Sequence, residues 1–333
     1  MYLKLPEPRS AGLILSYRCS SRCKHCLYNC SPFWENTWIS KEALKEILQI
    51  LSQYLERSLF LSFNYGLHLT GGEPFLNYPL LFEAVSFSKS LGIRPLLIET
   101  NAHWCTDKNR AYNKLSELKK AGLDGILISV NPFLAEYVPF KNTEILIEAA
   151  SQFFGDRVII YQKIFYQVFK TLNLKDKISL EEFLKISHRS FYFSELLPMG
   201  RACYKLAFLF KRYPPQVFFE ENCLGEFLNP YHVHVDNFGN YILGFCAGLS
   251  PVKIYDLPKI LRDGLNLAKK PILKALATNL KSLYELAKKD FGYEPLEEGY
   301  ISKCHLCLDI RKFLVEKGAF FEELSPTEYY YRV

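Results

Sequence analysis

Short apolar runs alternate with longer amphipathic stretches along the first two hundred residues of the chain. The apolar runs predict strands, and they lie at 11–15, 65–70, 93–99, 125–130, 157–164 and 190–197. Apolar residues at helical spacing predict helices between them, at 41–57, 79–91, 108–121 and 144–154, and again from 180 onward. Ser40, Asp107 and Ser179 stand where N-caps are expected, and Glu182 would complete a capping box with Ser179.

Six strands that alternate with helices predict an α/β fold with a parallel sheet. In barrels of this kind the carboxyl ends of the strands meet at one mouth, where active sites are built. Beyond residue 202 the pattern changes to shorter segments, among them a predicted hairpin at 233–241 with its turn at 237–240. We therefore expect two domains, 1–202 and 203–333, the second a smaller α+β extension.

Composition narrows the class of protein. The chain has 333 residues, of which 49% are hydrophobic and 15% aromatic, enough for a large core. The formal net charge of +6 is mild and does not by itself point to nucleic acid. Residues 1–10 lack the apolar core of a signal peptide, and no run of apolar residues is long enough to cross a membrane. We expect a cytoplasmic protein.

Ten cysteines in such a chain favour metal binding over disulfides. Cys19, Cys23 and Cys26 follow the first predicted strand at the spacing C-x3-C-x2-C. Soft thiolates select zinc, copper(I) or an iron–sulfur cluster. A zinc knuckle is the alternative here, with Cys30 as a fourth ligand. His25 lies between two ligand positions, and we expect it to face outward.

A second motif, Gly71-Gly72-Glu73, follows the second predicted strand. Together with the cysteine loop it resembles the signature of the radical SAM superfamily. That resemblance implies a partial (β/α)6 TIM-like barrel. It also implies a [4Fe-4S] cluster held by Cys19, Cys23 and Cys26, with an open fourth iron that binds S-adenosyl-L-methionine. Such a cluster is oxygen-labile, so an anaerobic or strongly reducing setting is expected.

The resemblance also suggests cofactor-binding residues. Gly71 and Gly72 would let the backbone approach the methionine moiety, and Glu73 would accept a hydrogen bond from its amino group. The other candidates lie at strand ends and after the barrel: Asn101, Ser129, Asn131 and Arg201. For each of these the structural alternative is a turn or cap residue.

A second cysteine set lies in the C-terminal region: Cys223, Cys246, Cys304 and Cys307. It resembles the SPASM or twitch extension of radical SAM enzymes, which implies one auxiliary [4Fe-4S] cluster. Four thiolates at this spacing would serve a structural zinc site equally well. Cys203 is an alternative ligand, and Cys30 and Cys105 are expected to be spare buried thiols.

The expected activity follows from the resemblance. It implies an enzyme that reductively cleaves S-adenosyl-L-methionine to a 5′-deoxyadenosyl radical, which abstracts hydrogen from a substrate. Peptide or protein modification is the first substrate hypothesis, and a small molecule of cofactor or haem biosynthesis is the alternative. A flavodoxin or ferredoxin is the expected reductant. The lysine-rich stretch 251–290 leaves open a non-catalytic metal-binding module that contacts nucleic acid, although a solvated helix face explains it more simply.

Overall fold

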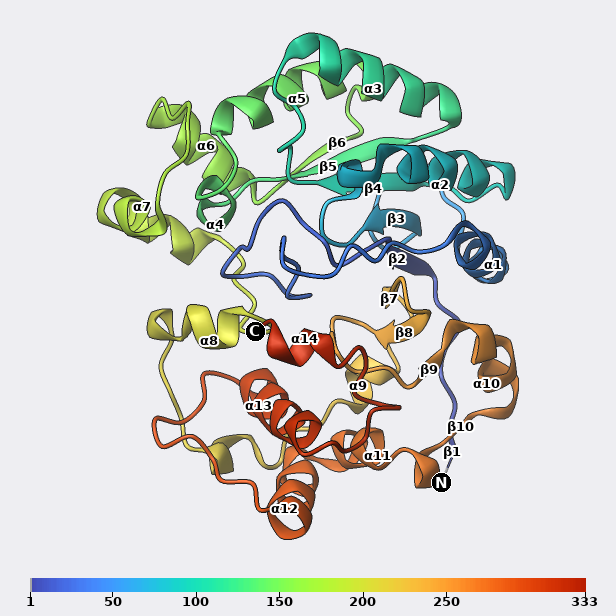
Figure 1. The fold of residues 1–333 in the computed structure, drawn as a ribbon, viewed down its shortest axis with the longest axis vertical. Coiled ribbons are helices and arrows are strands. Elements are labelled where there is room, and N and C mark those ends of the chain that lie inside the picture. Colours follow the sequence, from blue (N-terminus) through green and yellow to red (C-terminus); the bar gives the residue numbers. More distant parts are fainter. Residues whose placement is uncertain (1) are drawn as a thin grey trace. The chain divides into compact units, whose positions relative to one another are not determined.

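The computed structural model describes residues 2–333 (Figure 1). The chain forms two compact units. The N-terminal unit comprises Arg9–Cys23 and Cys30–Leu196, and the C-terminal unit comprises the residues through Pro8, Lys24–Asn29 and Leu197–Val333. Within residues 2–333 every helix is too short or too polar to span a bilayer. The C-terminal unit thus begins near residue 202 but also includes Lys24–Asn29 from the first predicted domain. The domain boundary at 202 stays a prediction.

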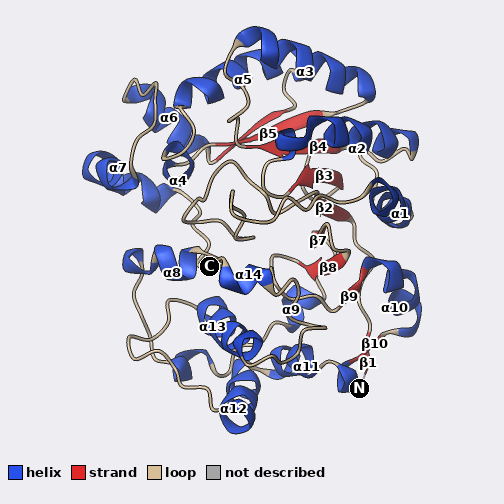
Figure 2. Ribbon diagram, in the orientation of Figure 1, coloured by secondary structure: helices blue, strands red, loops and turns tan. Residues whose placement is uncertain are grey.

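The N-terminal unit is built on parallel strands in the order β6-β5-β4-β3-β2 (Figure 2). Their bounds are β2 Ser10–Ile14, β3 Gly66–Thr70, β4 Leu96–Thr100, β5 Gly125–Ser129 and β6 Val158–Tyr161. Every residue of β2 and β3 is buried. Strands buried on both faces read as continuous apolar runs, which is how the sequence presents them. The predicted α/β class with a parallel sheet is confirmed.

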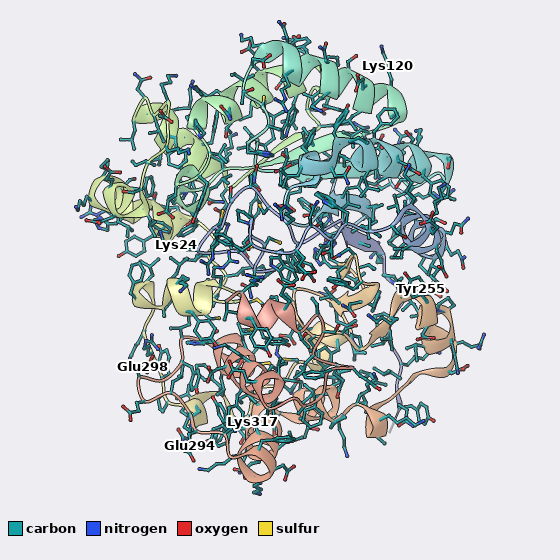
Figure 3. The ribbon with its side chains drawn as sticks, viewed as in Figure 1. Lys24, Lys120, Tyr255, Glu294, Glu298 and Lys317 are labelled. Carbon is teal, nitrogen blue, oxygen red and sulfur yellow. The ribbon has the colours of Figure 1, made fainter. Side chains whose placement is uncertain are left out.

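Helices follow the strands in this unit and cover the sheet. They are α1 Lys41–Ser52, α2 Tyr78–Ser90, α3 Lys108–Ala121, α4 Pro132–Ala135, α5 Phe140–Phe154, α6 Lys163–Thr171 and α7 Leu180–Ser187. α2 packs between α1 and α3, α5 packs beside α3, and α5 also contacts β5 and β6. The polar faces point to solvent, as Lys120 at the end of α3 shows (Figure 3).

The predicted helix starts are confirmed by their hydrogen bonds. The side chains of Ser40 and Asp107 accept from backbone N–H groups in the first turns of α1 and α3. Ser179 and Glu182 form the reciprocal capping box at α7. Gly122 ends α3 with φ +111°, a conformation that L side chains rarely adopt.

The sixth predicted strand, 190–197, is wrong, because His188–Phe193 is a 3-10 helix. The aromatic run has high strand propensity, but tertiary packing overrides it. The Phe191 ring lies 5.3 Å from Phe165 and 5.9 Å from Phe183 in an aromatic cluster. Tyr192 and Phe193, which a sheet would partly bury, are 81% and 77% exposed.

Other boundaries also differ from prediction, among them the start of β4, which begins at Leu96 and not at residue 93. α1 ends at Ser52 instead of continuing to residue 57, and α5 begins at Phe140, four residues earlier than expected. β6 ends at Tyr161 because Gln162 has φ +62°, and the left-handed backbone there turns the chain into α6.

The C-terminal unit contains short antiparallel strands. β1 Tyr2–Leu3 pairs with β10 Leu265–Asn266, while β7 Val233–Val235, β8 Asn240–Leu243 and β9 Val252–Lys253 form a meander. The predicted hairpin is confirmed. In its turn the Asp236 carboxylate accepts from the N–H groups of Phe238 and Asn240, and Gly239 has φ +74°.

The helices of this unit are α8 Ala202–Lys205, α9 Leu224–Phe227, α10 Leu257–Asp263, α11 Pro271–Thr278, α12 Leu280–Phe291, α13 Lys303–Glu316 and α14 Glu328–Tyr331. The lysine-rich stretch is largely helical, as expected. α12 packs against both α11 and α13.

Three phenols converge on Asp309 of α13. The hydroxyls of Tyr204, Tyr293 and Tyr300 donate to its carboxylate at 3.1, 2.6 and 3.2 Å. Because charge-assisted hydrogen bonds are stronger than neutral ones, this cluster anchors α13, the helix that carries Cys304 and Cys307.

The aromatic cluster makes a stability prediction. Phe183→Ala removes a fully buried ring and should lower the free energy of unfolding by about 3–5 kcal/mol. Phe193→Ala, an exposed neighbour, should change it by less than about 0.5 kcal/mol. Urea unfolding of both variants tests the difference, and equal losses would contradict the packing described here.

Candidate functional site

The two sequence motifs pair through their backbones in the N-terminal unit. Gly72 N–H donates to Ser16 O at 2.8 Å, and Glu73 N–H donates to Arg18 O at 3.1 Å. The Gly-Gly-Glu turn therefore lies directly against the residues that lead into the cysteine loop. A separation of about fifty residues in sequence becomes direct contact in the fold.

This approach is too close for side chains. A Cβ atom on Gly72 would lie 1.8 Å from Arg18 O, and one on Gly71 would lie 2.4 Å from Ser16 O. Gly71 also has φ +124°, which favours glycine. The chain's own backbone thus requires both glycines. Both glycines therefore have a structural role. Whether they also lie against the methionine moiety of a cofactor stays a prediction.

Glu73 is buried, with 1% of its surface exposed. Its Oε1 accepts from Phe75 N–H at 3.1 Å and Thr100 Oγ1 at 2.9 Å, and its Oε2 accepts from Asn101 N–H at 2.7 Å. Burial raises the pKa of Glu73 to about 7, against the hydrogen bonds, which lower it. The carboxyl group therefore ties the turn after β3 to the end of β4, while its contact with a cofactor amino group stays a prediction.

Asn101 links this turn to the first cysteine. Its Nδ2 donates to Ser20 Oγ at 3.0 Å and to Cys19 Sγ at 3.6 Å. Ser21 N–H also donates to Cys19 Sγ, at 3.4 Å. A sulfur that accepts two N–H groups is stabilised as a thiolate. A continuous hydrogen-bonded path thus runs from Glu73 through Asn101 to Cys19.

The cysteine loop contributes to both units. Cys19, which is buried, and Cys23, which is half-buried, belong to the N-terminal unit, whereas the half-buried Cys26 belongs to the C-terminal unit. There Cys26 O accepts from Arg201 N–H at 3.1 Å. A Cβ on Gly200 would lie 2.7 Å from the same oxygen, so the segment packs tightly against the third cysteine.

Arg201 is buried, and its Nε donates to Arg332 O at 3.2 Å. Burial and the nearby Arg201 cation lower the pKa of His25 to about 4, so this imidazole is neutral at pH 7. The expectation that His25 faces outward is wrong, because its Nδ1 is buried.

Glu99 is a residue that the sequence analysis missed. It lies in β4, where its carboxylate accepts from Thr70 Oγ1 at 2.7 Å and from Ser129 Oγ at 3.4 Å. Burial raises its pKa. The structure therefore brings together polar side chains from the ends of β3, β4 and β5. The sequence did contain a signal for it, because Glu99 is an acidic residue directly after the apolar run Leu96–Ile98 of a predicted strand.

Asn131 is the N-cap residue of α4, which is the structural alternative that the sequence analysis gave for it. Its Oδ1 accepts from Leu134 N–H at 2.9 Å at the start of α4, and the residue is buried. A contact with the cofactor carboxylate or ribose stays a prediction for both Asn131 and Ser129.

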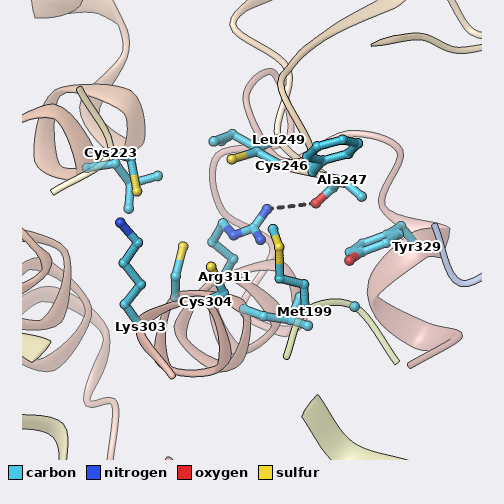
Figure 4. A pocket seen from close by; sticks show the side chains of 14 residues that line it. Met199, Cys223, Cys246, Ala247, Leu249, Lys303, Cys304, Arg311 and Tyr329 are labelled. Carbon is cyan, nitrogen blue, oxygen red and sulfur yellow. Dashed lines mark hydrogen bonds between the residues drawn. The ribbon is translucent and has the colours of Figure 1, made fainter. Parts of the chain in front are cut away.

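The second cysteine set lines one cavity in the C-terminal unit (Figure 4). Cys223 precedes α9, Cys246 follows β8, and Cys304 and Cys307 lie in the first turns of α13. Among residues 2–333, no three of these sulfurs lie within 4.8 Å of one another. A tetrahedral zinc ion with Zn–S bonds of about 2.3 Å would hold its sulfurs about 3.8 Å apart. In every trio of these sulfurs at least one pair is therefore farther apart than a single zinc ion would hold it.

Burial also affects the chemistry of these thiols. Together with the neighbouring sulfurs, it raises the pKa values of Cys246 and Cys304 to about 12. Forming thiolates here therefore calls for a strong positive charge close by. Cys203 does not line the cavity; its buried thiol donates to Pro198 O at 3.2 Å.

Comparison with known proteins agrees with this arrangement. Residues 13–145 match the model of the Radical SAM superfamily. This stretch is similar to radical SAM domains. It contains both motifs, the cysteine loop and the Gly-Gly-Glu turn, together with β4 and β5. A search of curated proteins finds no match to the chain.

Two solved structures are similar to the chain at low sequence identity. BtrN in complex with AdoMet and 2-DOIA is similar with a TM-score of 0.48 at 13% identity, over 83% of this chain and 89% of that chain. Native anSMEcpe with bound AdoMet has a TM-score of 0.46 at 12% identity, over 93% and 98% of the two chains.

The glycine contact predicts a marked asymmetry between two substitutions. Gly72→Ala places a methyl group against backbone that has little room to move, and should lower the free energy of unfolding by about 3 kcal/mol or more. Gly225→Ala is the matched control: it lies in α9 with open space around it, and should be neutral or slightly stabilising. Thermal and urea unfolding check both, and an unperturbed Gly72→Ala protein would refute the contact.

The buried Glu73 predicts a pH dependence of stability. Its pKa is about 7 in the folded protein against 4.5 for an ordinary Glu, so between these values the folded state holds a proton that the unfolded chain has lost. The free energy of unfolding should fall by about 3 kcal/mol as the pH rises from about 4.5 to about 7. Urea unfolding of the apoprotein should show this loss in the wild type and not in Glu73→Gln. If the difference in free energy of unfolding between the wild type and Glu73→Gln is the same at every pH, this prediction is wrong.

Proposed function

We propose that this chain is a radical SAM enzyme. In this proposal Cys19, Cys23 and Cys26 hold three irons of a [4Fe-4S] cluster whose fourth iron binds S-adenosyl-L-methionine. When bound, the cluster supplies the electron that cleaves the sulfonium and gives a 5′-deoxyadenosyl radical. The single observation that carries the proposal is the pairing of the Gly-Gly-Glu turn with the cysteine loop inside the matched domain.

The residues around Cys19 fit this role. Asn101 and the Ser21 amide donate to its sulfur, and hydrogen bonds to cluster sulfurs raise the reduction potential. Glu73 orients Asn101 through the backbone and is itself held by Thr100. The chain thus holds one thiolate in a fixed direction before any metal arrives.

Cofactor contacts are proposed at the strand ends. Gly71, Gly72 and Glu73 would approach the methionine moiety, and Ser129 and Asn131 the carboxylate or ribose. To these we add Glu99, because its carboxyl group joins the ends of β3 and β5 and is well placed to orient Ser129. Arg201, whose backbone N–H donates to Cys26 O, is proposed to lie near the cofactor.

An auxiliary iron–sulfur cluster is proposed for the C-terminal unit, as in SPASM or twitch extensions. Cys223, Cys246, Cys304 and Cys307 would be its four ligands, and Cys203 would be a spare thiol. The separation of the sulfurs favours a cubane over one zinc ion, because a larger core needs a wider set of ligands. A four-thiolate zinc site is the alternative.

The proposed substrate class is a peptide or protein, with a small molecule of cofactor or haem biosynthesis as the alternative. A flavodoxin or ferredoxin is the proposed electron donor, and the proposed setting is an anaerobic cytoplasm. The nucleic-acid alternative has weaker support. A solvated helix face explains the exposed lysines of α12, and one of them, Lys289, is already paired with Glu285.

Anaerobic reconstitution tests the enzyme class. With iron, sulfide, dithionite and S-adenosyl-L-methionine, the protein should release 5′-deoxyadenosine, measured by liquid chromatography and mass spectrometry. The variant Cys19→Ala/Cys23→Ala/Cys26→Ala should lose about four irons per chain and all of the product. Cys105→Ala, a buried cysteine outside both sets, is the control and should keep both. Product formation by the triple variant would exclude these residues as ligands.

The auxiliary site has its own test. Cys304→Ala/Cys307→Ala should lose about four irons per chain and keep the cluster at the first site, while Cys203→Ala should keep all of its iron. Iron and zinc are counted by inductively coupled plasma mass spectrometry. If this variant keeps all of its iron and loses zinc, the auxiliary site binds zinc and the proposed cluster is wrong.

A further inference from the structure

A buried arginine lines the four-cysteine cavity. Arg311 is 6% exposed and lies on α13, four residues after Cys307 and seven after Cys304. Residues at this spacing share one face of a helix. Figure 4 shows its side chain reaching from α13, beside Cys304, toward Cys246. One helix therefore presents both the paired cysteines and a cation to the same cavity.

The hydrogen bonds of Arg311 leave its charge uncompensated. Nη1 donates to Ala247 O and to Tyr330 Oη, both at 3.0 Å, and both acceptors are neutral. The Tyr330 ring lies 5.6 Å from the guanidinium carbon. Within residues 2–333, Nε has no hydrogen-bond partner. The ionisable groups that act on it most are Tyr329, Tyr330, Cys246 and Cys307, and it also acts on Cys203 and Cys304. Among residues 2–333, none of the ion pairs includes Arg311.

A buried cation without an anion is costly. Moving an unpaired charge out of water costs several kcal/mol or more, and buried charges in proteins are accordingly paired. The tyrosines are held in their neutral form, since burial raises their pKa values. The cavity cysteines Cys246, Cys304 and Cys307 are then the groups that can balance Arg311. They become anionic when they bind a metal.

We propose that Arg311 compensates the negative charge of a metal-bound four-thiolate centre and thereby raises its reduction potential. This rests on the proposed auxiliary cluster. Four thiolates around a dicationic cubane carry a net charge of about −2, and each electron added makes it more negative. A fixed cation in low dielectric favours the reduced form. Arg311 acts here as a positioning and charge-balancing residue and is not itself a ligand.

Lys303 provides a matched comparison. It lines the same cavity, yet its Nζ donates to Asn222 O and pairs with Glu226 at 2.8 Å, with Glu221 at 3.8 Å. Its charge is therefore already balanced and partly screened by solvent. Removing this cation should affect the centre much less than removing Arg311.

The test uses the full chain carrying Cys19→Ala/Cys23→Ala/Cys26→Ala, so that only the auxiliary centre remains. Dye-mediated titration with dithionite, followed by electron paramagnetic resonance, measures its potential. Arg311→Gln should shift the one-electron equilibrium at least tenfold toward the oxidised form, a potential 59 mV more negative. Arg311→Lys should stay within threefold of the parent, and Lys303→Gln should shift less than Arg311→Gln.

The outcomes separate the two proposals. A parent chain without iron at this site refutes the auxiliary cluster, and with it the basis for Arg311. A loaded centre whose potential is the same in the parent and in Arg311→Gln overturns the role of Arg311 alone. A third outcome is that Arg311→Gln fails to bind the cluster, whereas Arg311→Lys binds it with the potential of the parent. The positive charge is then needed for assembly of the centre, which supports the proposal. Loss of the centre in both variants would show that shape and not charge matters, and would overturn it.

Discussion

The approach of the Gly-Gly turn to the backbone at 16–18 is the contact on which the rest of the N-terminal unit depends. Two backbones meet where neither could carry a Cβ atom, and their N–H and C=O groups pair. This fixes the turn after β3 against the start of the cysteine loop. Glu73 can then reach the end of β4, and Asn101 can reach Cys19. The direction of the first thiolate is thus a consequence of glycine packing.

Each unit buries ionisable groups at its candidate site. In the N-terminal unit, Glu73 and Glu99 are carboxyl groups whose pKa values are raised by burial, and both join the ends of neighbouring strands. In the C-terminal unit, Arg311 is a cation without a carboxylate, in a cavity lined with thiols. Each arrangement costs stability in the apoprotein. Buried ionisable groups with shifted pKa values are concentrated at functional sites.

α13 shows how the C-terminal unit maintains such a cavity. Ser302 caps the helix, and Asp309 accepts from three phenols on one side of it. The face that carries Cys304, Cys307 and Arg311 is therefore presented by a helix whose position is already determined by polar contacts. A rigid scaffold reduces the entropy that a bound metal must overcome when it orders its ligands.

The sequence by itself determined the alternation of strands and helices, the helix caps and the two cysteine sets. These follow from local periodicity, from side chains that bond to nearby backbone, and from spacing. It did not reveal that 190–197 would form no strand, because the Phe191 ring is drawn into a cluster with Phe165 and Phe183. Nor did it single out Glu99 or Arg311. Their importance comes from burial and from the groups that the fold places around them, and only the folded chain decides which groups are removed from water.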